Sequence, residues 1–113
     1  KQSFKWIDLL DFFKTFDPSF GAGTRFVPSD ILVQLNVNAD LKTKLNALKQ
    51  YTPERSKYSD ILSKIINEMR SDRFIELENE ISEQYKVLSS FKYLEELVLS
   101  IQITDEAIHE IPE

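Results

Sequence analysis

The chain has 113 residues, which suits a single domain, and it contains no cysteine, which excludes a disulfide framework and a thiolate zinc site. Hydrophobic residues make up 42% and charged residues 29%, a composition typical of a globular domain, and no apolar run approaches the ~20 residues of a membrane span. The net charge of -5 argues against a nucleic-acid ligand, because phosphate contacts need a concentrated basic surface.

The first predicted element is a helix from Phe4 to Phe16, which ends before Asp17-Pro18 because proline disfavours helical geometry in the residue before it. Seven of the thirteen aromatic residues fall within the first 26 positions of the chain. They carry more apolar surface than one helix can direct at one small core, so we expect some of them to bind a partner. The predicted anchors are Trp6, Phe12, Phe16 and Phe20.

Residues 17–29 contain both glycines and two of the four prolines, and this composition predicts a long ordered loop. Gly21-Ala22-Gly23 lacks the lysine and the third glycine of a phosphate-binding loop, so we interpret these glycines as turn residues with positive φ. A short helix through Leu35 is predicted next. Residues 32–37 also alternate in polarity, which is the pattern of a strand.

Helical spacing is clearest in the middle of the chain. Leu41, Leu45 and Leu48 share one face of a helix predicted over 39–51, which Asn38 can cap. Thr52-Pro53 predicts a new helix start, and that helix breaks near Asp72. A further helix is predicted after this break, with an apolar stripe formed by Phe74, Leu77, Ile81, Tyr85 and Leu88. The apolar spacing continues beyond Leu88, and we expect the helix to be interrupted at Ser89-Ser90.

Taken together, these elements predict an all-α fold, a compact bundle of five or six helices with a long N-terminal loop. The alternative is an α+β fold in which residues 32–37 and 97–103 form a minimal two-stranded sheet. The chain begins at Lys1, and we expect residues 1–113 to be a single domain excised from a larger protein.

No motif in the sequence indicates catalysis or a cofactor. Glu106-x-x-His109 has the spacing used in carboxylate-bridged di-metal bundles, but such sites need a second copy of the motif, and the chain has one histidine. No serine lies in a Gly-x-Ser-x-Gly elbow. We therefore predict no catalytic residue, no metal, no cofactor and no enzymatic activity.

Charge is distributed unevenly along the chain. Residues 1–57 carry nine basic and six acidic side chains, a balance of +3, whereas residues 58–113 carry five and thirteen, a balance of -8. On the helix predicted there, one face presents Glu76, Glu80 and Glu83 as a second, charged partner-binding surface.

The function predicted from these surfaces is protein–protein interaction, as an adaptor or accessory domain that binds a protein partner or other domains of its parent protein. The alternative is a small acidic inhibitor or immunity-type protein that masks a basic toxin or nuclease. We expect no nucleic-acid and no membrane ligand. The sequence specifies neither the oligomeric state nor the compartment, although a cytoplasmic location is favoured.

Overall fold

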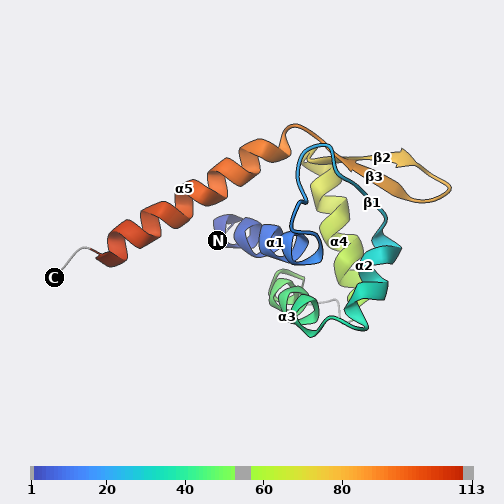
Figure 1. Ribbon diagram of the computed structural model, residues 1–113, viewed down its shortest axis with the longest axis horizontal. Coiled ribbons are helices and arrows are strands. Elements are labelled where there is room, and N and C mark those ends of the chain that lie inside the picture. Colours follow the sequence, from blue (N-terminus) through green and yellow to red (C-terminus); the bar gives the residue numbers. More distant parts are fainter. Residues whose placement is uncertain (1, 53–56, 111–113) are drawn as a thin grey trace.

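The computed structural model describes residues 2–52 and 57–110, with side chains described for 5–52 and 57–100. Within these ranges five α-helices and a three-stranded antiparallel sheet form an α+β fold (Figure 1). The helices are α1 (Gln2–Phe16), α2 (Pro28–Leu35), α3 (Ala39–Leu48), α4 (Tyr58–Ser71) and α5 (Phe91–Glu110), and a 3-10 turn, η1 (Lys49–Tyr51), follows α3. The strands are β1 (Arg25–Phe26), β2 (Ile75–Asn79) and β3 (Gln84–Val87), arranged in the order β1-β3-β2.

The predicted all-α bundle is wrong, because the segment after Asp72 forms a β-hairpin instead of a helix. Strand β2 pairs with β3 in an antiparallel register that places Ile75 opposite Val87 and Leu77 opposite Tyr85. Ile75, Tyr85 and Val87 are buried on one face of the sheet, which is the alternation of a strand. Phe74, Leu77, Ile81 and Tyr85 in the same segment fit a helical spacing, so the apolar period alone did not distinguish the two structures.

The alternative α+β class is correct, but its strands were placed in the wrong segments. Residues 32–35 belong to α2, whose buried Ile31 and Leu35 are separated by one helical turn. Residues 97–103 belong to α5, in which Leu94 and Val98 are buried with the same spacing. In both segments a face repeating every four residues packs against the core, and this packing selects a helix over a strand.

The middle helices follow the sequence closely. Asn38 caps α3, because its side-chain oxygen accepts a hydrogen bond from the Leu41 N–H at 3.0 Å. Helix α4 begins at Tyr58 instead of Thr52, and the predicted Pro53 start lies outside the described residues. The predicted break near Asp72 is confirmed, since α4 ends at Ser71. The interruption at Ser89-Ser90 is also confirmed, since it separates β3 from α5.

A chain of aromatic rings links α1, the loop after it, the sheet and α5. The Phe13 and Phe20 rings stack with 4.7 Å between their centroids, and Phe26 stacks on Tyr85 at 5.7 Å. Phe20 also meets Phe91 edge to face at 5.6 Å. Because each ring comes from a different element, their burial holds the N-terminal loop and the start of α5 against the sheet.

The loop between α1 and α2 is pinned to the sheet by its backbone. Gly23 has a φ of +91°, as predicted for a turn glycine, whereas Gly21 does not adopt the predicted positive φ. The Gly23 N–H donates a 2.8 Å hydrogen bond to the Val87 carbonyl. The Val87 N–H in turn donates to the Thr24 carbonyl at 2.8 Å. The predicted loop therefore supplies β1, the third strand of the sheet.

The described side chains of helix α5 pack on the body in its first half. Its 20 residues span about 30 Å, and the buried side chains among those described are Phe91, Leu94 and Val98. Figure 1 shows the helix running away from the other elements on the side opposite the hairpin, which gives the molecule its longest dimension of 56 Å. Among the described residues, no helix is long and apolar enough to cross a membrane.

Candidate functional site

The four predicted aromatic anchors are divided between the core and its margin. Phe12 and Phe20 are completely buried, so neither side chain lies on the surface of the folded chain. Trp6 and Phe16 are half-buried and pack against the core. The premise that the core lacks room for these rings is therefore wrong for Phe12 and Phe20: Phe12 packs against Phe13 within α1, and the loop and β1 add Phe20 and Phe26 to the Phe13 ring.

Trp6 lies at the edge of the core next to the sheet. Its ring meets Phe74 edge to face, with 5.4 Å between centroids, and the Lys5 ammonium lies 6.0 Å from the Trp6 centroid. Lys5 also forms an ion pair with Glu68 of α4. These contacts hold Trp6 in place and leave part of its ring accessible. Trp6 is therefore not a freely exposed anchor; it lies at the border of the surface between α1 and α5 that is described next.

That neighbouring surface lies between α1 and α5. A cavity of about 310 Å3 opens there, lined by Ile7, Leu10, Asp11, Lys14 and Val98. Ile7 and Leu10 are half-buried and lie on the flank of α1 next to Trp6, since Leu10 follows Trp6 by one turn. The apolar part of this cavity is thus formed by α1 residues that the core does not fully cover.

Ion pairs neutralise the charged groups of this cavity. The Lys14 ammonium lies 2.9 Å from Glu95 Oε2 on α5, and it also donates a hydrogen bond to the Phe20 carbonyl. Asp11 pairs with Lys44 of α3 at 2.7 Å, and this carboxylate raises the pKa of Lys44 through a hydrogen bond and its charge. With both charges paired inside the chain, the cavity is best matched by an apolar ligand group.

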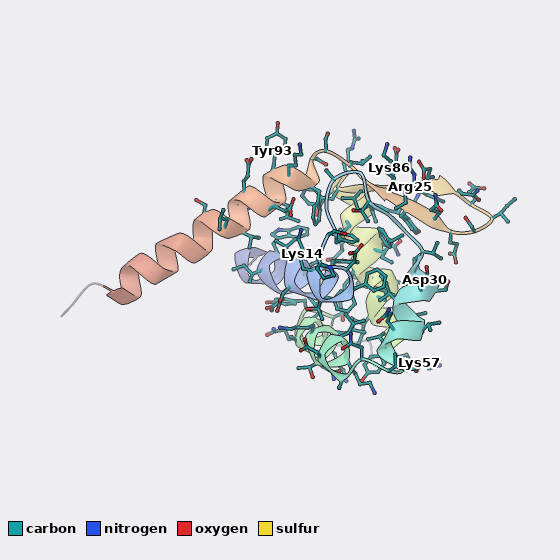
Figure 2. All side chains as sticks on the ribbon, in the orientation of Figure 1. Lys14, Arg25, Asp30, Lys57, Lys86 and Tyr93 are labelled. Atoms are coloured by element: carbon teal, nitrogen blue, oxygen red, sulfur yellow. The ribbon has the colours of Figure 1, made fainter. Side chains whose placement is uncertain are left out.

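Helix α5 exposes apolar side chains beside the cavity. Of the six large apolar side chains that the described residues expose, Tyr93, Leu97 and Leu99 belong to α5. Leu99 follows Glu95 by one turn, which places it on the side of α5 that Lys14 contacts. Tyr93 points away from the body (Figure 2). We define the α1–α5 surface as Ile7, Leu10, Val98 and Leu99, together with Leu97 on the outer flank of α5, where it follows Tyr93 by one turn.

The predicted acidic surface is located on the hairpin. Glu76, Glu80 and Glu83 are exposed, but they do not share a helix face: Glu76 lies on β2, and the other two lie in the turn between the strands. Glu76 stands opposite Lys86 in the ladder. Lys86 and Arg25 lie close together on the outer face of the sheet (Figure 2), so that face carries both signs of charge.

One further ion pair on this face joins β1 to β2. Arg25 Nε donates to Glu78 Oε1 at 2.7 Å, and Gln84 donates to the same oxygen at 2.9 Å. These hydrogen bonds, with the Arg25 bond the stronger cause, lower the pKa of Glu78 below its ordinary value. The pair raises the pKa of Arg25 for the same reason. The concentrated negative charge of the hairpin is therefore limited to its turn.

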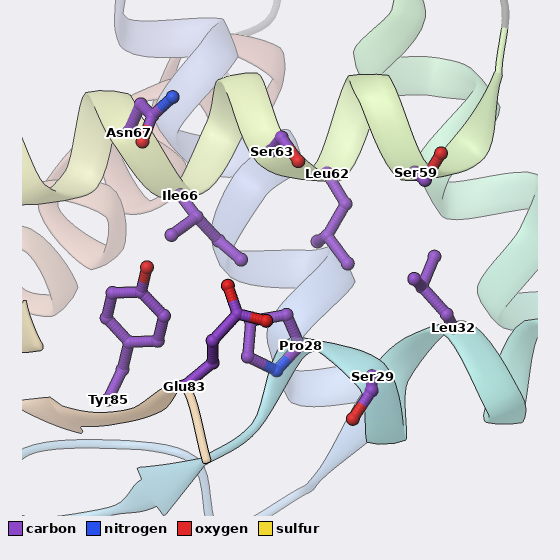
Figure 3. A pocket seen from close by; sticks show the side chains of 10 residues that line it. All are labelled: Pro28, Ser29, Leu32, Ser59, Leu62, Ser63, Ile66, Asn67, Glu83 and Tyr85. Atoms are coloured by element: carbon purple, nitrogen blue, oxygen red, sulfur yellow. The ribbon is translucent and has the colours of Figure 1, made fainter. Parts of the chain in front are cut away.

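A polar cavity of about 260 Å3 lies between α2, α4 and the hairpin (Figure 3). Ser59, Ser63 and Asn67 line it from successive turns of α4, and Figure 3 shows the Glu83 carboxylate and the Tyr85 hydroxyl on the opposite side. A general acid–base site needs two titratable groups in reach of one substrate, and Glu83 is the one carboxylate in this lining. Among the described residues, no group of three His, Cys, Asp or Glu side chains is placed to hold a metal ion.

The exposed apolar side chains of α5 could not be located from the sequence. Leu97 and Leu99 were predicted within an alternating segment, and their exposure follows only from where α5 leaves the body. The side chains of Glu106 and His109 lie outside those described. The available signal was the run of apolar residues that continues past Val98, which exceeds what one helix can bury on a small body.

Comparison with known proteins identifies one family. Residues 1–98, most of the chain, match the model of the condensin complex protein MksE. No curated protein and no solved structure matches the chain significantly.

Proposed function

Because this chain belongs to the MksE family of condensin complex proteins, we propose that it is a non-catalytic subunit that holds a protein partner of that complex on its α1–α5 surface. A protein of a complex has protein partners, and the family therefore supports the accessory role. The single observation that supports this surface is the exposure of Leu97 and Leu99 on a helix that projects beside the half-buried Ile7 and Leu10.

The chemistry of the surface indicates what it would bind. Its apolar side chains come from two helices, and the charges between them are paired within the chain. An amphipathic segment of another subunit can place an apolar ridge against Ile7, Leu10 and Leu99 and extend around α5 to cover Leu97. Trp6, as the border next to Leu10, would widen the contact on the α1 side.

The proposal is tested by copurification of the complex. The double variant Leu97→Gln/Leu99→Gln removes two exposed apolar groups and keeps residues that favour a helix. Full burial of a leucine side chain contributes about 1.5–3 kcal/mol, and Leu97 and Leu99 are 49% and 58% exposed, so covering both contributes about half of that for each; the loss of both predicts a decrease in affinity of at least about tenfold. The measurement is the retention of the other condensin-complex subunits by tagged chain from the source cells.

A matched control is available in the same molecule. Val33→Gln/Val37→Gln also removes two exposed apolar groups, which lie on and after α2. It should retain the complex at the wild-type level. Equal retention by both double variants would contradict the α1–α5 surface, and concentration-dependent doubling of the mass of the isolated chain would assign it to self-association instead.

A further inference from the structure

The sheet of this protein has an open edge at β2. In the strand order β1-β3-β2, β2 pairs with β3 alone. Val87 of β3 lies opposite Ile75, and both backbone groups of Val87 form hydrogen bonds on the other side, with Gly23 and Thr24. Ile75 and Val87 are therefore a non-hydrogen-bonded pair, which directs the Ile75 N–H and C=O away from β3. The same alternation directs the Leu77 backbone to the open edge.

A cavity of about 510 Å3 lies along this edge, and its lining includes two arginines. It is formed by Arg70, Arg73, Ile75, Glu76, Leu77 and Leu88. The Arg70 guanidinium lies 5.8 Å from the ring centroid of Tyr85, which is paired with Leu77, so Arg70 lies on the Leu77 face of the sheet. Arg70 and Arg73 are both exposed, and neither has an ion-pair partner among the described side chains.

We propose that the β2 edge binds an extended acidic segment of a partner protein as a fourth strand of the sheet. Unpaired N–H and C=O groups at Ile75 and Leu77 supply the backbone ladder, and the two arginines supply charge complementarity. The site lies apart from the α1–α5 surface, so it does not depend on the function proposed for that surface.

The pleat of the sheet also specifies the pattern of the bound segment. Side chains of an added strand alternate between the two faces. Those on the Leu77 face meet Arg70, and Arg73 lines the same cavity, whereas the other face offers Glu76 and the Glu78 carboxylate that Arg25 already holds. Acidic residues at every second position are therefore favoured, because an uninterrupted acidic run would place half of its charges on a face that offers them no unpaired arginine and brings some of them next to Glu76.

The first test is the protection of specific amides in the full chain. Three eight-residue peptides serve as probes: one alternates Glu and Thr, one has the same composition with the four Glu in a block, and one alternates Lys and Thr. The alternating Glu peptide should slow hydrogen exchange at the Ile75 and Leu77 amides at least tenfold when saturating, the block peptide less, and the Lys peptide not at all. Equal protection by the Lys peptide would overturn the proposal, and so would binding without protection of these two amides.

The second test uses charge reversal. Arg70→Glu/Arg73→Glu should weaken binding of the alternating Glu peptide at least tenfold. The control Lys42→Glu/Lys49→Glu changes two exposed residues, one on α3 and one in η1, and should leave the affinity within twofold. If the reversed variant fails to fold, Arg70→Gln/Arg73→Gln must still weaken binding at least threefold. An unchanged affinity overturns the proposal. A single-stranded DNA oligonucleotide that binds through the arginines better than the peptide, without protecting either amide, also overturns it.

Discussion

The ammonium of Lys14 on α1 lies 2.9 Å from Oε2 of Glu95 on α5, one turn before Val98, the last buried residue described on that helix. This ion pair joins the two helices at the point where α5 leaves the body. Together with the burial of Phe91, Leu94 and Val98, it holds the start of α5 against the body and leaves Leu99 exposed one turn after Glu95.

The first prediction concerns the energy of this ion pair. Both side chains are about one-third exposed, at 35% and 31%, so a double-mutant cycle with Lys14→Gln and Glu95→Gln should give a coupling energy of at most about 1 kcal/mol. Lys14→Gln alone should cost more than Glu95→Gln, because Lys14 also donates to the Phe20 carbonyl. Urea unfolding measures both. An equal loss of unfolding free energy in Glu95→Gln and Lys14→Gln would show that the hydrogen bond from Lys14 to the Phe20 carbonyl contributes nothing.

The second prediction separates core rings from border rings. Phe20→Ala should lower the free energy of unfolding by about 3–5 kcal/mol, because the ring is completely buried and contacts Phe13 and Phe91. Trp6→Ala should cost less, because the ring is half-buried. Thermal or urea unfolding compares the two variants. A smaller loss for Phe20→Ala than for Trp6→Ala would place Phe20 outside the core.

The third prediction concerns the pH dependence that Glu78 contributes. Its pKa in the folded chain lies below the ordinary value of 4.5, chiefly because Arg25 donates a hydrogen bond to the carboxylate. The stabilisation is therefore present above the unfolded pKa and is lost as the pH falls through the folded pKa. An NMR titration of the Glu78 carboxyl carbon should show its pKa rising toward the ordinary value in Arg25→Gln. An unchanged pKa would mean that Gln84 alone holds the carboxylate.

The fourth prediction concerns the hairpin turn. Glu83 has a φ of +56°, a conformation that costs a non-glycine residue roughly 1–2 kcal/mol. Glu83→Gly should thus leave the free energy of unfolding unchanged or raise it by up to about 1 kcal/mol. Glu80→Gly removes the same charge at a position without positive φ, and it should lower that free energy instead. Equal losses in both variants would show that the turn is not strained at Glu83.

The helices could be predicted where one apolar stripe matched one buried face. Leu41, Leu45 and Leu48 are all buried as their spacing predicted, and Asn38 caps the helix they belong to. The hairpin could not, because its strands are only five and four residues long and Phe74, Leu77 and Ile81 also repeat at helical spacing. Its turn also lacks the glycine that marks most tight turns, and Glu83 adopts the positive φ instead.

The sequence predicted the location of the candidate site near the N-terminus but not the residues that form it. The surplus of apolar surface near the N-terminus was visible in the sequence, but its assignment to rings was wrong for Phe12 and Phe20, because β1 pairing with a distant strand supplies the core that buries them. The residues that remain accessible next to Trp6 are aliphatic. Ile81 illustrates the same limit, since its place in the apparent helical stripe gave no sign that it would be 98% exposed in the hairpin turn.

The most direct test of the α1–α5 surface compares amide hydrogen exchange in the isolated chain with exchange in the assembled condensin complex. The account predicts that residues 7–14 and 94–100 exchange at least tenfold more slowly in the complex, because a partner covers both helices there. Unchanged exchange in both segments, with slowing confined to other parts of the chain, would contradict it.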